Sequence, residues 1–205
     1  MFQNVKLLIV DPEEFMRARL KEAPLWQPTF LILLGGIFQS FPTFLILNRA
    51  NISGGLQGTV LGVAQLVGVI SGLLLLLSIW LAIAVVLHVV TSLLGAETGE
   101  LSETFQLVGW GLFPLTIQNL LNAGVSWQVL QRVPAGTSLS QIQTFYQSST
   151  LVTVATVVGL MFVVWEGFIW MFGLQRVRDI PRKKALLAAS LPVVAQIVFA
   201  INGLI

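Results

Sequence analysis

The chain has 205 residues, of which 56% are hydrophobic and only 10% are charged. A soluble domain carries about 25% charged residues, so this composition excludes a water-soluble globular protein. The mean hydropathy of +0.88 indicates an integral membrane protein. The sequence has no cysteine and one histidine, which excludes disulfides, zinc–thiolate sites and a His-rich metal centre. We therefore expect no metal and no cofactor, and a net charge of +2 does not predict nucleic-acid binding.

The N-terminal segment, residues 1–27, predicts an amphipathic helix at the membrane surface. Asp11 can cap its first turn, and Pro12 fits the first helical position. Glu13 and Glu14 complement the positive end of the helix. This helix is either a lead-in to the first span or a docking surface for a partner, which would contact the acidic start and Phe15. Three basic residues would face lipid headgroups: Arg17, Arg19 and Lys21.

Five stretches are long and apolar enough to cross a hydrocarbon layer of about 30 Å. They predict an all-α bundle of five transmembrane helices within residues 28–205, with spans at about 28–48, 73–94, 104–124, 150–174 and 185–205. The glycine-rich segment 56–72 precedes the second span as a helical or irregular lead-in. Gly109, Gly111 and Pro114 predict a kink or loosening in the third span.

Lysine and arginine residues outside the spans are divided unequally between the two sides of the membrane. Four lie in the N-terminal segment and five in the fourth loop, whereas the opposite side has only Arg49 and Arg132. The positive-inside rule therefore predicts a cytoplasmic N-terminus and an external C-terminus. The basic residues of the fourth loop are expected to contact anionic lipid: Arg176, Arg178, Arg182, Lys183 and Lys184.

Four spans each carry one polar residue at a similar depth, about 9–16 Å from the cytoplasmic side at 1.5 Å per residue. They are Gln39, His88, Glu166 and Gln196. This layer is either a proton relay or cation pocket, or a network that fixes helix packing. A charge in hydrocarbon is costly, so we expect Glu166 to meet a partner, with His88 as the candidate.

The second loop carries three carboxylates, Glu97, Glu100 and Glu103, and no basic residue. They can gather a divalent cation, but acids at the start of a helix have a simpler explanation, because they complement its positive end. Ser102 is then expected to cap the third span. The loop can also dock against the basic fourth loop on the same side. Ser138 and Gln141 form a capping-box pattern that predicts a short helix before the fourth span.

Three stretches carry a family resemblance: LLIVDPEEFMRARL, LHVVTSLLGAETGELSETFQLVGWGLFPL and FGLQRVRDIPRKKALLAASLPVV. In this order they resemble the Yip-domain family of Ypt/Rab-interacting membrane proteins. The resemblance implies five spans and a cytoplasmic N-terminus. Eukaryotic members have a long polar N-terminal region and are associated with Rab-type GTPases. This chain has about 27 residues before its first span, and Gly95-Ala96 where a Gly-Gly pair is common. We therefore expect a prokaryotic member in the inner membrane, without a Rab-type GTPase partner.

Two functions are compatible with these features. The first is a non-enzymatic protein that organises membranes or recruits a partner protein, or a second copy, through its cytoplasmic face. The alternative is a small ion- or proton-coupled transporter or channel that uses the polar layer. An intramembrane enzyme is disfavoured, because the sequence shows no Ser/His/Asp set and no aspartate in any span.

Overall fold

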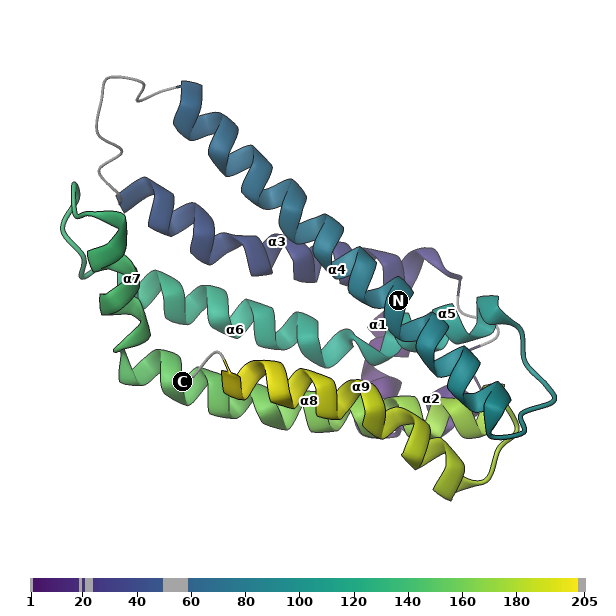
Figure 1. Cartoon of the computed structure of the whole chain (residues 1–205). Coiled ribbons are helices and arrows are strands. Elements are labelled where there is room, and N and C mark those ends of the chain that lie inside the picture. Colours follow the sequence, from purple (N-terminus) through teal and green to yellow (C-terminus); the bar gives the residue numbers. More distant parts are fainter. Residues whose placement is uncertain (1, 19, 21–23, 50–58, 203–205) are drawn as a thin grey trace.

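The computed structural model describes residues 2–18, 20, 24–49 and 59–202 of the chain, and all regular elements in these ranges are helices. The helices pack into an elongated bundle (Figure 1). In chain order they are α1 (Phe2–Val10), α2 (Pro12–Ala18), α3 (Trp26–Arg49), α4 (Thr59–Leu93), α5 (Leu101–Gly111), α6 (Phe113–Leu130), α7 (Leu139–Gln147), α8 (Thr150–Val177) and α9 (Arg182–Asn202).

Four of the helices, α3, α4, α8 and α9, are long and apolar enough to cross a membrane. Successive passes alternate in direction along the bundle (Figure 1). The expected span at about 104–124 is divided, because α5 ends at Gly111 and α6 begins at Phe113. α5 and α6 follow one another along the long axis, so the pair occupies the place of the third pass (Figure 1). The multi-pass all-helical fold is thus confirmed, and the count of five holds only if the divided pair is counted as one.

The division at Leu112 follows from the local sequence. Pro114 has no N–H and cannot donate to the carbonyl four residues earlier. Leu112 has φ −78° and ψ 2°, which interrupts the helix for one residue. Gly111 permits a close approach between the end of α5 and Trp170 of α8, because a Cβ at this position would lie 2.0 Å from Trp170 Nε1. The kink predicted from these residues is therefore present.

The long helix α4 includes much of the segment that the sequence left as a helical or irregular lead-in. It is continuous from Thr59 to Leu93, and its apolar part is assigned to residues 61–93. The expected lead-in is thus helical over its described part and runs without a break into the expected crossing at about residues 73–94. α4 approaches α3 at Gly72, where a Cβ would lie 2.1 Å from Ser40 Oγ and 3.3 Å from the Gly36 carbonyl oxygen. Gly62, in contrast, has no neighbour within 4 Å of such a Cβ.

Polar groups of α6 bind the backbone of α3. Thr116 Oγ1 donates to the Leu31 carbonyl at 3.0 Å, and Asn119 Nδ2 donates to the Gly35 carbonyl at 3.2 Å. Both side chains are buried. Hydrogen bonds of this kind hold membrane helices together, so the polar outer half of the third pass serves helix packing at these two positions.

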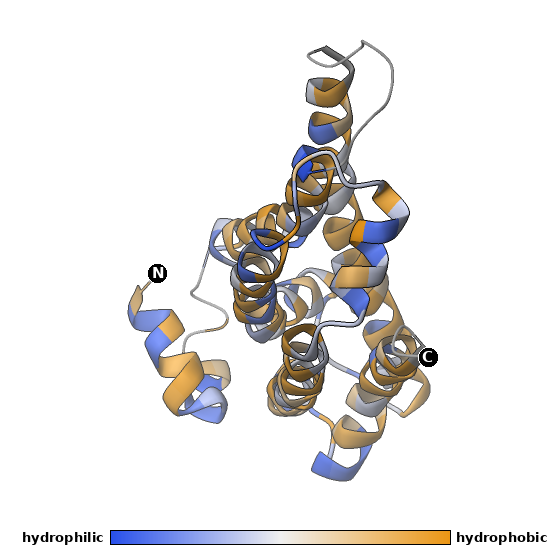
Figure 2. Ribbon diagram, turned by 90° about the vertical axis from the view of Figure 1, so that its left-hand side faces the viewer, coloured by the Kyte–Doolittle hydropathy of each residue, from blue (hydrophilic) through white to orange (hydrophobic). Residues whose placement is uncertain are grey.

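Hydrophobic residues predominate along the long helices (Figure 2), and many of their large apolar side chains are exposed on the isolated chain. Leu66, Met161 and Phe199 are 60%, 71% and 78% exposed in the isolated chain. In water this exposure would be costly, whereas in a bilayer these side chains contact lipid. The interior contains a second set of apolar residues centred on Trp110 and Trp170, which are both fully buried.

Candidate functional site

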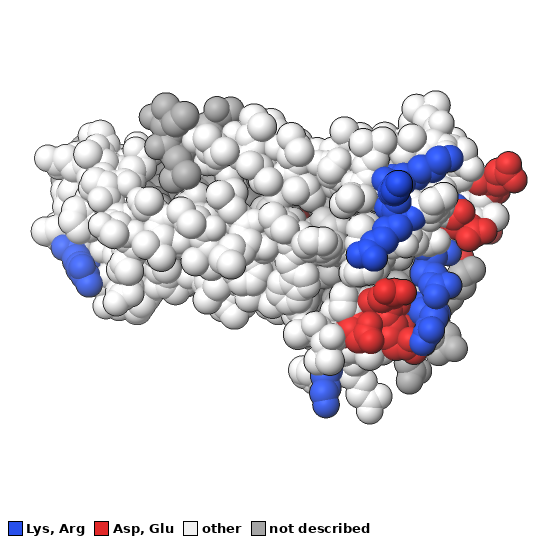
Figure 3. All heavy atoms as spheres, turned by 90° about the horizontal axis from the view of Figure 1, so that it is seen from below, with Lys and Arg blue, Asp and Glu red and all other residues white. Residues whose placement is uncertain are grey.

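Charged side chains are concentrated at one end of the bundle (Figure 3). We call this part the charged end: α1, α2, the loop 94–100, the start of α5 and the segment 176–184. It forms where α4 and α8 end and where α5 and α9 begin. All the predicted cytoplasmic interaction residues lie within it, and so do the described basic residues of the fourth loop.

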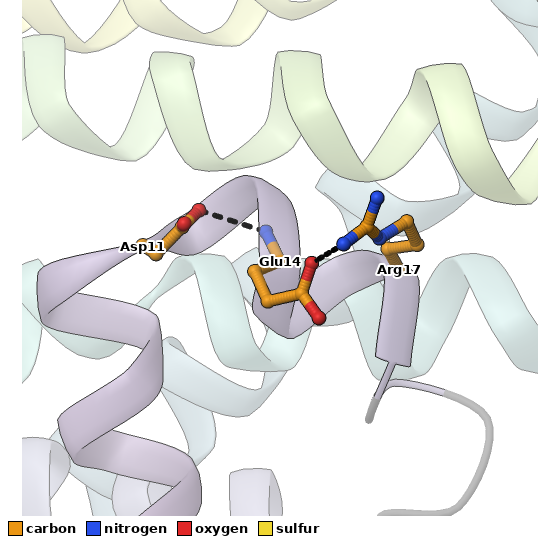
Figure 4. Close-up of polar contacts among 3 residues, drawn as sticks. All are labelled: Asp11, Glu14 and Arg17. Carbon is orange, nitrogen blue, oxygen red and sulfur yellow. Dashed lines mark hydrogen bonds and ion pairs between the residues drawn. The ribbon is translucent and has the colours of Figure 1, made fainter.

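The start of α2 is organised as its sequence predicts. Asp11 Oδ1 accepts a hydrogen bond from the Glu14 backbone N–H at 2.9 Å, and Pro12 occupies the first helical position (Figure 4). The Glu14 carboxylate forms an ion pair with Arg17 on the next turn (Figure 4). Asp11 and Glu13 remain exposed. The acidic start of α2 therefore points outward from the bundle.

Phe15 has a different role from the one expected. Its side chain is fully buried and meets the ring of Trp110 edge-to-face, with 5.0 Å between ring centroids. Met16 and Leu20 are also buried, and α2 packs against α8. The prediction that Phe15 contacts a partner is wrong, because the apolar face of α2 is turned into the bundle. Arg19 and Lys21 lie outside the described residues.

The helix preceding α2 was not anticipated from the sequence. α1 covers Phe2–Val10, and its Leu8 is fully buried. Asn4 Nδ2 donates to Gln27 Oε1 at 3.0 Å, which joins α1 to the start of α3. Apolar residues at helical spacing, Phe2, Val5, Leu8 and Ile9, give a weak signal for this helix in the sequence.

Two of the three carboxylates predicted in the second loop, Glu100 and Glu103, cap α5. Glu100 is the N-cap residue, and its backbone N–H donates to Glu103 Oε2 at 3.1 Å. Ser102 is therefore not the cap as predicted, since it lies inside the first turn and its hydroxyl donates to Glu100 Oε2. Glu97 is exposed. The described residues contain no group of three His, Asp or Glu side chains able to hold a metal ion.

Arg178 joins three segments of the charged end and does not face lipid headgroups as predicted. It is only 3% exposed. Its Nε donates to Thr91 Oγ1 at 3.1 Å, its Nη2 donates to Ser92 Oγ at 2.6 Å, and its Nη1 donates to the Gly99 carbonyl. Burial lowers the pKa of the guanidinium, and the negative charge of Glu103 opposes this shift. The prediction fails because the C-terminal turn of α4 and the second loop cover this side chain.

The loop conformation that receives Arg178 depends on a glycine. Gly99 has φ +83°, and a Cβ there would lie 2.1 Å from the Val177 carbonyl oxygen. Lys184 makes a second link, since its Nζ donates to the Leu94 carbonyl at 2.7 Å. The second and fourth loops therefore meet, as the sequence suggested, and these links end on hydroxyls and backbone carbonyls. Among the described basic residues that were predicted to face lipid headgroups, those with exposed side chains are Arg17, Arg176, Arg182, Lys183 and Lys184.

The predicted polar layer separates into three places. Glu166 is fully buried, and its Oε2 accepts a hydrogen bond from Gln196 Nε2 at 3.2 Å. His88 Nδ1 lies 3.1 Å from Thr104 Oγ1 instead of meeting Glu166. Gln39 lines a cavity beside Asn119 and Asn122. The structure thus brings Glu166 and Gln196 together, whereas the hypothesised pair of His88 and Glu166 is not formed.

The Glu166 carboxyl group is incompletely paired. Its Oε1 has no hydrogen-bond partner among the described residues. The backbone of Leu115, in the first turn of α6, also lies close to this carboxyl group. The break in the third pass therefore places the start of α6 near Glu166, a proximity that sequence spacing could not reveal.

The long apolar helices and the charges concentrated at one end define a multi-pass helical membrane protein. The chain matches the Yip1 domain over residues 6–202 and belongs to that family. The resemblance seen in the three motifs is thereby confirmed. Searches of curated proteins and of solved structures found no significant match.

Proposed function

We propose that this protein is non-enzymatic and recruits partners to a membrane through the charged end, which faces the cytoplasm. One observation carries the proposal. Phe15 and Met16 anchor α2 in the bundle, so that Glu13 on the same short helix is held outward in a fixed position. An anchored helix loses little conformational freedom when a partner binds, which favours recognition.

The charge pattern around α2 supports a specific surface. Figure 3 shows acidic and basic groups side by side at this end. Glu97 and Glu100 are exposed on the second loop, and Lys183 is exposed in the first turn of α9. Complementary charge between partners steers their encounter and excludes wrong partners. Exposed lysine and arginine residues next to a bilayer also attract anionic lipid, by about 1 kcal/mol each.

Co-purification from native membranes tests the proposal. Glu13→Lys combined with Glu97→Lys reverses two exposed charges without touching the core, so partners of the wild type should be lost at low salt. Gln147→Lys, on an exposed position of α7, is the matched control and should retain them. Recovery of the same partners by the charge-reversed protein would contradict the proposal.

The alternative, ion- or proton-coupled transport, is supported by one observation, the buried and incompletely paired carboxyl group of Glu166. Ionisable groups inside membranes are often part of ion pathways. Transport predicts a proton or cation flux into liposomes containing the protein, abolished by Glu166→Gln. Absence of flux across a panel of ions removes this alternative and leaves partner recruitment.

A further inference from the structure

Two adjoining cavities lie among α3, α6, α7 and α8, away from the charged end. The first, of about 260 Å³, has a mixed lining, in which apolar residues alternate with five polar ones: Gln39, Asn119, Asn122, Tyr146 and Thr156. The second, of about 210 Å³, is lined mainly by apolar residues of α6 and α8, including Leu151, Val154 and Phe162. We call them the polar cavity and the apolar cavity.

The two cavities are neighbours that share three lining residues. Asn122, Val125 and Ala155 line both of them. Together the cavities reach the range of about 300–1,000 Å³ that is typical of small-molecule sites. A ligand that occupies both would need a hydrogen-bonding end and an apolar end, which is the chemistry of a lipid.

The polar lining selects the kind of headgroup. The described residues that line the two cavities include no lysine, arginine, histidine, aspartate or glutamate. A phosphate would be desolvated there without a counter-charge, which is costly. Amides and hydroxyls instead match the donors and acceptors of alcohol groups. The lining therefore favours an uncharged headgroup that carries hydroxyls.

Two polar side chains of the polar cavity already have hydrogen-bond partners within the protein. Asn119 and Tyr146 are engaged with Gly35 and Ser126. In the apolar cavity, Gln118 Oε1 is buried and has no hydrogen-bond partner among the described residues. A headgroup hydroxyl would therefore bind the amides of Gln39 and Asn122 in the polar cavity, since the buried Gln118 oxygen has almost no accessible surface for a ligand to reach.

We propose that the two cavities form a binding site for a lipid with an uncharged, hydroxyl-bearing headgroup, of the diacylglycerol or glycosyl-diacylglycerol class. The headgroup occupies the polar cavity, and the first part of an acyl chain occupies the apolar cavity. This site is independent of partner recruitment, because it lies on other helices and away from the charged end.

Photolabelling of the full chain tests the site. The protein is placed in phosphatidylcholine nanodiscs with a trace of photoactivatable diacylglycerol or, in parallel, photoactivatable phosphatidylglycerol. Diacylglycerol should label the wild type, with cross-links on α6 and α8. Asn122→Leu removes hydrogen-bonding groups and should lower labelling about tenfold, the effect of roughly one lost hydrogen bond. Ala155→Phe fills the junction and should lower labelling at least as much, because the ligand no longer fits. Gln128→Leu, exposed on α6 and outside both linings, should label normally.

Competition in the wild type provides a test that does not depend on the folding of a variant. Excess unlabelled diacylglycerol should suppress labelling, whereas free glycerol should not, because the apolar cavity requires an acyl chain. Three results would overturn the site: equal labelling by phosphatidylglycerol, undiminished labelling in both variants, or labelling that unlabelled diacylglycerol fails to suppress.

Discussion

The guanidinium of Arg178 donates hydrogen bonds to Thr91 and Ser92 near the end of α4 and to the Gly99 carbonyl in the second loop. A charged donor shared among neutral acceptors contributes more than an ordinary hydrogen bond, about 1.5–3 kcal/mol. Because it is nearly inaccessible to solvent, no water can replace these contacts when the side chain is removed. Arg178 is thus a structural residue of the charged end, which keeps the second loop in place against α8.

Arg178→Met should destabilise the protein by about 2–3 kcal/mol, since it leaves two hydroxyls and a carbonyl without their charged donor. This corresponds to a fall in Tm of roughly 5–10 °C for a chain of this size, measurable by thermal unfolding in detergent. Arg176→Met removes an exposed guanidinium two residues away and should change Tm by less than about 2 °C. Equal effects of the two substitutions would show that Arg178 is not structural.

The contact between Glu166 and Gln196 predicts a coupling that the originally expected pair should lack. In a double-mutant cycle, Glu166→Gln and Gln196→Leu should be non-additive by about 0.5–1 kcal/mol in the free energy of unfolding. Glu166→Gln and His88→Ala should be additive, because His88 contacts Thr104 instead. Strong coupling between His88 and Glu166 would contradict the arrangement described above.

Side-chain roles in this protein were predictable where they depend on neighbours along the chain. Asp11 caps α2 and Ser138 forms its capping box with Gln141, as the local pattern indicates. Arg178 and Phe15 were misassigned, because their partners lie 87 and 95 residues away, in Thr91 and Trp110. A basic residue in a loop and an aromatic residue in an amphipathic helix give no sign of burial until the packing is known.

At the level of elements, α5 and α8 approach one another through glycines. A Cβ on Gly111 would lie 2.0 Å from Trp170 Nε1, and one on Gly173 would lie 1.8 Å from Leu107 Cδ1. Trp170 and Leu107 are fully buried, so neither can move aside into open space. The two glycines therefore set the distance between these helices.

Gly111→Ala should cost about 1–3 kcal/mol, because the added methyl group overpacks the contact with Trp170. Gly124→Ala, within α6, meets nothing within 4 Å and should be neutral or stabilising by up to about 1 kcal/mol through helix propensity. Thermal unfolding of the two variants side by side checks the prediction. A Gly111→Ala protein with the same Tm as the wild type would contradict it.

Helix existence was well predicted here and helix continuity was not. Long apolar runs predicted α3, α8 and α9 because hydrocarbon length sets the length of a span. The composition of an apolar run does not predict whether the helix that it forms is continuous or interrupted. α4 extends through a glycine-rich segment, whereas the third pass is divided at Leu112 next to Gly111 and Pro114. Glycines occur in both places, and only the third pass also has a proline, Pro114. Proline alone does not decide the matter either, because Pro42 and Pro192 lie inside the helices α3 and α9.

For the whole molecule, the unequal distribution of basic residues predicts the orientation, and the absence of native cysteine makes this simple to measure. Lys183→Cys and Arg132→Cys each introduce one exposed thiol, at opposite ends of the bundle. A membrane-impermeant maleimide applied to intact cells should label Arg132→Cys and should label Lys183→Cys only after permeabilisation. The cysteine-free parent is the control, and the reverse pattern would invert the topology.

The continuous length of α4 has a consequence for the surrounding bilayer. Residues 61–93 are apolar and extend for about 50 Å at 1.5 Å per residue, against a hydrocarbon thickness of about 30 Å. Tilt alone would have to exceed roughly 50°, beyond the 0–40° seen for membrane helices. The excess length is met by extension of a helix end beyond the hydrocarbon, by a locally thickened bilayer or by a neighbouring protein. To the extent that this stretch lies in lipid, the protein is expected to favour a thick bilayer, which reconstitution in lipids of increasing chain length would measure as rising stability.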